Sequence, residues 1–213
     1  FHQFLQEVVT PRTGRPNLLM GHSMGGHILT RYLHRYPAST DRAVLVAPMT
    51  KINTGAAPEA LMYGIAENAC RIGLNREYAV SQHGHNESNE DFRTNRLTTD
   101  QERFKASIAP IRINPDLALG GITYGWLTAA IRSMRKARKA AYLRKVLTPV
   151  LLVSPVNDRV VDPADHITVA KRLHDCKLHR IHSAEHEILH ENDFVRKSFW
   201  RAFDNFSAPA LKR

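Results

Sequence analysis

A single tight turn constrains this chain more than any other stretch. The sequence Gly-His-Ser-Met-Gly-Gly at residues 21–26 follows the short apolar run 17–20 and precedes apolar residues at helical spacing. The run predicts a buried strand, and the spacing after it predicts one face of a helix. Because strand and helix nearly touch at such a turn, we expect the residues two before and two after Ser23 to lack bulk. The chain must therefore fold as strand, sharp turn and helix at this point.

The Gly-x-Ser-x-Gly pattern in this context is typical of a nucleophile elbow. The turn lifts the Ser23 hydroxyl above the edge of the sheet. We expect the Met24 N–H to lie at a helix N-terminus, where it can stabilise a developing oxyanion. The alternative is a glycine-rich turn with an incidental serine, and partner residues elsewhere in the chain decide between the two interpretations.

Strand and helix signals alternate on both sides of a long middle segment. The patterns predict helices at 1–9, 24–36, 163–173 and 192–206, and strands at 17–20, 42–48, 149–154 and 177–181. This alternation predicts an α/β fold with a mostly parallel sheet and helices on its faces. In the middle segment strand signals vanish, and we expect short helices near 58–72, 100–107 and 126–144. We therefore predict a core of residues 1–48 and 149–213, with 49–148 inserted as a mostly helical cap.

Composition narrows the class of protein. The chain has 213 residues, of which 43% are hydrophobic and 23% charged, and no run approaches the roughly 18 apolar residues that a membrane span needs. Cys70 and Cys176 lie far apart and are predicted to be free and reduced, which favours a cytoplasmic protein. The formal net charge of +10 favours anionic partners. No nucleic-acid motif accompanies it, so we expect no nucleic-acid partner.

A serine nucleophile requires a base that takes its proton and an acid that orients the base. Around an elbow these residues follow in the chain order Ser, acid, His. Asp158 and Asp162 are the acids that follow the predicted strand at 149–154. Asp162 directly precedes Pro163 and therefore has a sufficient role as the cap of the next helix. Asp158 has no such role, and we assign it as the acid.

Three histidines follow the last predicted strand. We assign His186 as the base because it lies where a loop would leave the strand, whereas His182 is close to the strand end and His190 is one helical turn further on. His186 to His190 also match His-Glu-x-x-His, a zinc-peptidase pattern. A zincin needs both histidines on one helix, and this match begins in a predicted loop. His83 and His85 lie in a polar loop with no complete ligand set, so we predict no metal site.

With these positions placed, the chain resembles the α/β-hydrolase superfamily, in its bacterial lysophospholipase and monoacylglycerol-lipase-like (serine aminopeptidase S33-type) branch. The likeness rests on the elbow, on the His186 segment followed by Glu191, and on two predicted cap segments at 95–104 and 122–127. The resemblance implies Ser23, Asp158 and His186 as a catalytic triad that uses no cofactor. It also implies that early strands and a second oxyanion donor precede Phe1, so we expect the N-terminal part of the fold to be absent from this sequence.

The resemblance predicts a serine carboxylic-ester hydrolase that acts on a lysophospholipid or a monoacylglycerol through an acyl-enzyme on Ser23. One alternative keeps the triad and changes the substrate, as in a proline-type aminopeptidase or a small-ester hydrolase. An acidic cluster in the cap that could hold a substrate amine would favour an aminopeptidase, and the only such group is Glu87, Glu90 and Asp91, in a loop-like stretch. A further alternative is a non-catalytic binding protein, which has no need of all three triad residues.

Two features of the predicted cap concern the lipid. Apolar residues there are candidates for an acyl pocket, although packing is the commoner role for each taken singly: Leu61, Met62, Phe104, Trp126 and Leu127. The segment 132–145 is rich in Arg and Lys and contains no acid. It predicts either a solvated charged face or a helix that contacts anionic lipid. In the second case the protein would be peripheral to the inner membrane.

Overall fold

The structure is a computed structural model that describes residues 1–211, apart from the side chains of 87–88 and 209–211. Its centre is a four-stranded sheet in which all neighbours are parallel and the strands follow the chain order. The strands are β1 (Leu18–His22), β2 (Arg42–Val46), β3 (Val150–Pro155) and β4 (Cys176–Ile181). This arrangement confirms the predicted α/β fold. All four strands therefore end at the same edge of the sheet.

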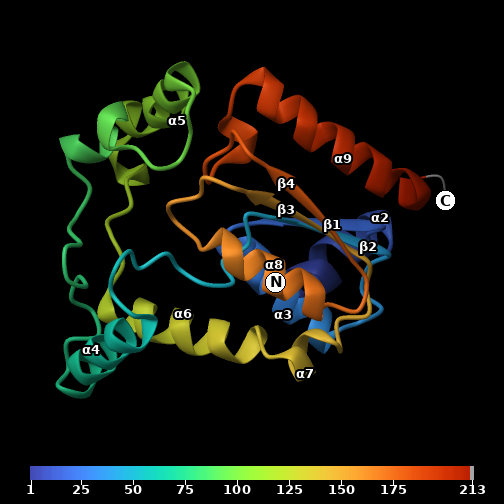
Figure 1. The fold of residues 1–213 in the computed structure, drawn as a ribbon, viewed down its shortest axis with the longest axis horizontal. Coiled ribbons are helices and arrows are strands. Elements are labelled where there is room, and N and C mark those ends of the chain that lie inside the picture. The colour runs from blue at the N-terminus through green and yellow to red at the C-terminus, as the bar shows by residue number, and fades with distance from the viewer. Residues whose placement is uncertain (212–213) are drawn as a thin grey trace.

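Helices cover both faces of the sheet (Figure 1). On one face lie α3 (Met24–Arg35) and α8 (Pro163–Arg172), and on the other lies α9 (Asp193–Leu211). The alternation of side chains along each strand produces the two cores. In β2, for example, Leu45 packs with α3 and α8, whereas Val46 packs with α9.

The long connection from β2 to β3 is helical and lies largely to one side of the sheet (Figure 1). Among the described residues, it contributes isolated bridges but no strand of the sheet. Its helices are α4 (Glu59–Arg71), α5 (Gln101–Ile113), α6 (Tyr124–Ala137) and α7 (Ala140–Leu143), with the short turns η2 (Glu87–Glu90), η3 (Phe92–Thr94) and η4 (Pro115–Leu117). A third apolar cluster joins α4 and α6 to the segments after β2 and β3.

Two helices of this connection differ from the sequence prediction. The single helix expected at 126–144 is two helices, because the chain leaves helical geometry at Lys139. Just before the break, Arg138 forms an ion pair with Glu59 of α4 at 2.7 Å, a contact that no local pattern contains. The helix expected to end at residue 107 continues to Ile113 and includes Pro110.

The first residues form one helical run that continues four residues beyond the predicted end at Val9. The run comprises α1 (His2–Phe4), the π-helical turn η1 (Leu5–Val9) and α2 (Thr10–Thr13). It ends at Gly14, whose φ of +73° is readily available only to glycine.

β1 is one edge of the described sheet, and its Met20 side chain is 45% exposed. Cys70 and Cys176 are both free. Within residues 1–211, no helix has the length and apolar character required to cross a bilayer.

Candidate active site

The turn between β1 and α3 holds Ser23 in an unusual conformation. Its φ of +50° lies in the left-handed region, which is strained for a residue with a side chain. Three backbone hydrogen bonds hold the turn in place. The Ser23 N–H donates to Val46 O at 2.9 Å, and the Ser23 carbonyl accepts from Met49 N–H at 2.9 Å and His27 N–H at 3.1 Å. The end of β2 and the residues after it therefore fix the serine.

The glycines of the turn do not contribute equally. A Cβ on Gly21 would lie 2.7 Å from the Gly25 carbonyl oxygen, so this position admits no side chain. A Cβ on Gly25 would meet nothing within 4 Å, and the prediction that residue 25 must lack bulk is wrong. Gly26 takes that role, because its Cβ would lie 2.9 Å from Pro48 Cβ. The tight contact comes from the segment after β2.

Gly21→Ala is therefore expected to destabilise the fold by about 3 kcal/mol, because the added methyl meets backbone atoms that cannot rotate away. Gly25→Ala is the matched control. We expect it to be neutral or to stabilise the fold by up to about 1 kcal/mol, because alanine favours the helix and the space is open. Urea unfolding followed by circular dichroism measures both. Equal unfolding midpoints for the two variants would contradict this account of the turn.

The structure brings Ser23, His186 and Asp158 into one hydrogen-bonded chain. His186 Nε2 lies 2.8 Å from Ser23 Oγ, and His186 Nδ1 lies 2.8 Å from Asp158 Oδ2. His186 and Asp158 are 3% and 4% exposed. The other oxygen of Asp158 accepts hydrogen bonds from the backbone N–H groups of Val160 and Val161 at 2.8 and 2.9 Å. A carboxylate that faces Nδ1 favours the proton on that nitrogen, which leaves Nε2 to accept from the serine hydroxyl.

The fold explains why these residues meet. Ser23 follows β1, Asp158 follows β3 and His186 follows β4, and all three strands end at one edge of the sheet. The rival residues lie elsewhere. Asp162 caps α8 through Ala164 N–H at 2.9 Å and binds Lys51 Nζ at 2.8 Å.

The environment of Asp162 fits its structural role. Burial raises the pKa of this carboxyl, but the Lys51 ammonium and the backbone N–H of Ala164 outweigh burial and lower the pKa below its usual range. The histidine rivals, His182 and His190, are both exposed.

A hydrogen-bond donor stands directly beside Ser23. Met24 is the first residue of α3, so its N–H has no acceptor within the helix. The N-terminal end of a helix also carries a partial positive charge, which favours an anion at this point. Met24 therefore lies at a helix N-terminus, as the sequence predicts.

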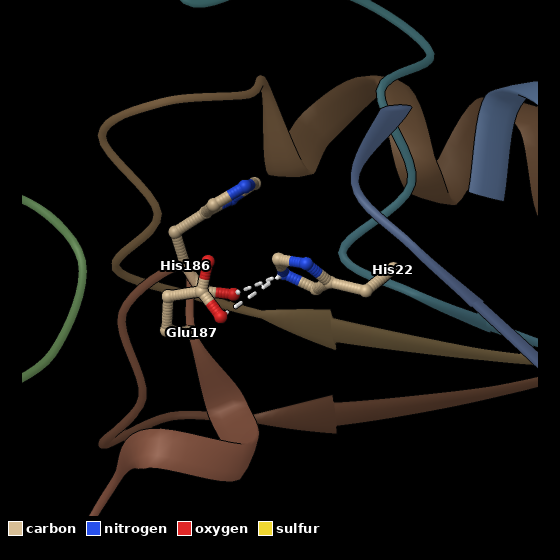
Figure 2. Close-up of side chains that lie close together, drawn as sticks. All are labelled: His22, His186 and Glu187. Carbon is tan, nitrogen blue, oxygen red and sulfur yellow. Dashed lines mark hydrogen bonds and ion pairs between the residues drawn. The ribbon is translucent and has the colours of Figure 1, made fainter. Parts of the chain in front are cut away.

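Figure 2 shows three side chains that lie close together and are of types that bind metals in proteins: His22, His186 and Glu187. Their nearest ligand atoms all lie within 4.8 Å of one another. However, His186 Nε2 is already hydrogen-bonded to Ser23, and His186 Nδ1 is hydrogen-bonded to Asp158. His22 Nε2 lies 3.1 Å from the His186 carbonyl oxygen. His190, the other histidine of the zinc-like pattern, lies in the single turn η5 (Ile188–His190). In this arrangement His186 is suited to proton transfer rather than to metal binding.

The apolar candidates of the predicted cap have ordinary packing environments, with one exception. Leu127 is 3% exposed in the cluster between α4 and α6, and Met62 and Trp126 pack against that cluster. Phe104 is 4% exposed and meets the ring of Phe92 edge to face. Leu61 is 55% exposed. A role in substrate binding stays a prediction for all five.

The acidic candidates are already engaged. Glu90 pairs with Arg112 at 2.7 Å and with His85 at 3.2 Å, and Asp91 pairs with Arg93 while it caps η3. The Glu87 side chain lies outside the described part of the structure. The carboxylates of Glu90 and Asp91 are therefore already paired with cations of this chain and are poorly placed to bind a substrate amine.

Sequence reasoning assigned no role to Glu191, although its carboxylate is fully buried beside the His186 segment. Its hydrogen-bond partners include residues more than ninety positions away in the chain. The one available signal was its place directly after the His186 segment, in the stretch that carries the family resemblance.

The chain matches the family described as serine aminopeptidase, S33, over residues 1–193. It is 29% identical to lysophospholipase L2 of Escherichia coli K12 in an alignment that covers 95% of this chain and 61% of that protein. It is 25% identical to the probable lysophospholipase L2 of Haemophilus influenzae, with 88% and 58% covered. The chain thus spans about three fifths of the length of these relatives.

Solved structures share the fold. The monoacylglycerol lipase of Paleococcus ferrophilus superposes with a TM-score of 0.69 at 17% identity, covering 98% of this chain and 74% of that one. A soluble variant of monoglyceride lipase from Saccharomyces cerevisiae, in complex with a substrate analog, gives 0.67 at 17% identity, covering 90% and 64%. Together with the family match, these likenesses show that the chain belongs to the serine aminopeptidase S33 family and has the α/β-hydrolase fold.

Proposed function

We propose that this protein is a serine carboxylic-ester hydrolase that cleaves a lysophospholipid or a monoacylglycerol through an acyl-enzyme on Ser23. The observation that carries the proposal is the hydrogen-bonded chain from Ser23 through His186 to Asp158. The names of the relatives, lysophospholipase L2 and monoacylglycerol lipase, support an ester of a fatty acyl chain as the substrate.

In the proposed mechanism Ser23 Oγ attacks the ester carbonyl while His186 Nε2 takes the hydroxyl proton. The Met24 N–H donates to the oxyanion, and Asp158 stabilises the imidazolium. His186 then gives its proton to the leaving glycerol oxygen, which yields the alcohol and an acyl-serine. A water molecule, deprotonated by His186, attacks the acyl-serine. This step releases the fatty acid and returns the proton to Ser23.

The segment 49–148 supplies the acyl-chain site in this proposal. We propose that it is a cap on a core formed by 1–48 and 149–213. Trp126 and Met62, at the edge of the α4–α6 cluster, are partly exposed and are candidates to touch the acyl chain, together with Leu61. Leu127 and Phe104 are buried and would shape the site from beneath.

A substrate panel on the full chain tests the function. It contains a lysophospholipid, a monoacylglycerol, short-chain esters and aminoacyl anilides, together with labelling by a serine-directed phosphonate. We expect labelling at Ser23, the fastest turnover on a long-chain ester, and a larger KM for long chains in Trp126→Ala. Preference for the anilides would support an aminopeptidase instead. Absence of labelling would support a binding protein.

The basic segment 132–145 is divided between two surfaces. On one side Arg135 and Arg138 bind the same carboxylate, Glu59 of α4, at 2.9 and 2.7 Å, and that carboxylate is only 11% exposed. These arginines hold α6 to α4, contrary to the expectation of a fully solvated or lipid-facing charged face. Among the exposed cations of the segment, Lys136, Lys139 and Lys145 lie together on another surface.

These lysines and two arginines of α3, Arg31 and Arg35, line one groove. We propose that this basic groove contacts an anionic membrane surface. The groove lies near the far end of α3 from Ser23, which is about 18 Å along a helix of 12 residues. At that distance the contact anchors the protein to a membrane and does not itself deliver the substrate.

Replacing the three lysines of the basic groove by glutamine is expected to weaken binding to phosphatidylglycerol vesicles by about 100-fold, at about 1 kcal/mol for each lysine. Added salt should weaken binding of the unmodified protein in the same way. Vesicle co-sedimentation measures both effects. The matched control neutralises another basic groove, between β4 and α9: Lys177, Lys197 and Arg201. Equal losses in the two variants, or binding that salt does not change, would contradict the assignment of the lysine groove.

A further inference from the structure

The carboxylate of Glu191 is fully buried and lies outside the triad. Oε1 accepts a hydrogen bond from the Glu185 N–H at 2.8 Å. Oε2 accepts from the Thr99 hydroxyl at 2.5 Å and the Thr99 N–H at 3.1 Å, and it lies 3.3 Å from the Thr98 hydroxyl. Burial of a charge is costly unless hydrogen bonds replace its water. Both oxygens of Glu191 are satisfied in this way.

Glu191 joins two segments that are far apart in the chain. One is the loop that carries His186, and the other is the segment 95–100, which we call the strap. The strap also meets this loop directly, because the Leu97 carbonyl accepts from the Glu187 N–H at 2.7 Å. The Thr98 hydroxyl adds a further contact, 2.8 Å from the His190 carbonyl oxygen.

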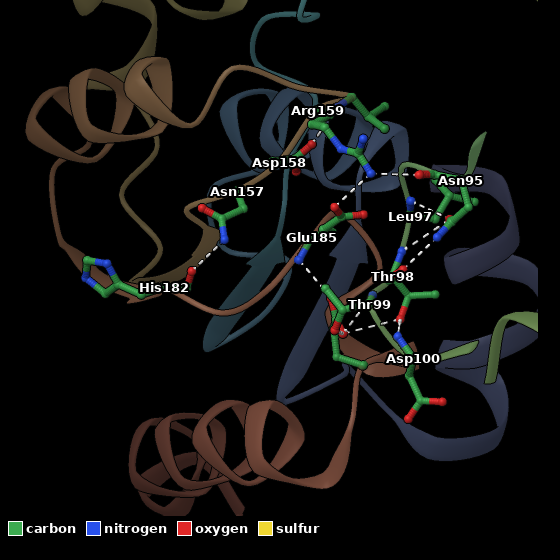
Figure 3. A network of polar contacts seen from close by, with 12 residues as sticks. Asn95, Leu97, Thr98, Thr99, Asp100, Asn157, Asp158, Arg159, His182 and Glu185 are labelled. Atoms are coloured by element: carbon green, nitrogen blue, oxygen red, sulfur yellow. Dashed lines mark hydrogen bonds and ion pairs between the residues drawn. The ribbon is translucent and has the colours of Figure 1, made fainter. Parts of the chain in front are cut away.

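The strap reaches the loop of the acid as well (Figure 3). Arg159, the residue after Asp158, donates to the Asn95 carbonyl at 2.7 Å and to Glu185 Oε1 at 2.8 Å. The backbone of residues 185, 186 and 187 also contacts other segments at each position. Glu191 binds the N–H of Glu185, His22 lies at the carbonyl of His186, and Leu97 binds the N–H of Glu187.

We propose that Glu191 is a positioning residue that sets the orientation of the His186 ring by clamping its loop to the strap. This inference rests on the proposed function, because it assigns the effect to the base of the triad. The ring must hold two hydrogen bonds of 2.8 Å at once, to Ser23 and to Asp158. Displacement of a reacting group by about 1 Å can lower the rate by 10²-fold. A loosened loop therefore affects turnover more than substrate binding.

Glu191→Gln tests the proposal in the full chain. The amide keeps the shape of the side chain but turns an N–H₂ group toward a donor, either the Glu185 N–H or the Thr99 groups. We expect kcat to fall by about 10-fold to 100-fold, with KM unchanged within about twofold. The low-field proton NMR signal of His186 Nδ1–H is expected to shift or disappear. Thr99→Val, which removes one hydroxyl donor and keeps the shape, is expected to change both readouts in the same direction by less.

Phe199→Leu supplies the control for stability. Phe199 lies on α9 and is fully buried in the apolar cluster between this helix and the sheet. This variant is expected to lose stability while it keeps kcat and the low-field signal. Wild-type kcat and an unchanged signal in both Glu191→Gln and Thr99→Val would overturn the proposal, as would an equal loss of kcat in Phe199→Leu. If the unmodified protein is not labelled by a phosphonate at Ser23, the proposed function fails, and the NMR signal still reports whether Glu191 orients His186.

Discussion

Ser23→Ala is expected to lower kcat for a long-chain monoacyl ester by roughly 10⁶-fold, by analogy with loss of the serine in a protease triad. The alanine cannot form the acyl-enzyme, and nothing else in the hydrogen-bonded chain can replace the oxygen that His186 Nε2 faces at 2.8 Å. Residual catalysis from binding and from the Met24 N–H would remain. Steady-state hydrolysis on the full chain measures the loss, and mass spectrometry checks for loss of phosphonate labelling.

His186→Ala is the companion variant. Because triad residues act as a unit, it should lose about as much activity as Ser23→Ala, and the double variant should lose little more. Circular dichroism of each variant should match that of the unmodified protein. Retained hydrolysis in Ser23→Ala would remove the serine from the mechanism and with it the proposed function.

Asp158→Asn is expected to lower kcat by about 10⁴-fold, with little change in KM. The hydrogen bonds around the side chain determine how asparagine will sit. The N–H groups of Val160 and Val161 require an oxygen acceptor, so the amide N–H₂ must face His186 Nδ1. Two donors would then oppose each other, and the imidazole would place its proton on Nε2. The base could no longer accept the proton of Ser23.

Asp162→Asn is the matched control. Asparagine caps a helix about as well as aspartate, so the cap of α8 is kept and only the ion pair with Lys51 is lost. We expect kcat to stay within about twofold of the unmodified protein, since this pair is partly exposed and contributes little. The comparison is made by steady-state kinetics on the same ester. If Asp162→Asn loses as much activity as Asp158→Asn, the assignment of the acid is wrong.

Local patterns were sufficient for the sheet and for the helix cap at Asp162. The strands around Val44 and Leu151 are continuous apolar runs because helices cover both faces of the sheet at these central strands. Asp162 was separated from Asp158 by a capping pattern that lies entirely within neighbouring residues, and the cap is present. Features of this kind are encoded over a few positions, so the sequence alone predicts them.

Contacts between distant segments were not predictable in the same way. Gly26 needs its small size because Pro48 packs against it from another element, and the sequence gives no reason to prefer it over Gly25. The break after α6 accompanies the pairing of Arg138 with Glu59, 79 positions away. Glu191 meets Thr99 at a separation of 92 positions. Each of these depends on tertiary packing, which no local pattern contains.

The distance along the chain between the residues of the proposed triad has a consequence for folding kinetics. Ser23 and His186 are separated by 163 positions, and β2 pairs with β3 across the whole of the long connection. Contacts of this range close large loops and form slowly, whereas β1, the elbow and α3 are local. The turn can thus form early in folding, before His186 is in place to take the proton of Ser23. Because His186 follows β4, the rate at which phosphonate labelling of Ser23 recovers during refolding is expected to equal the rate at which β4 joins the sheet.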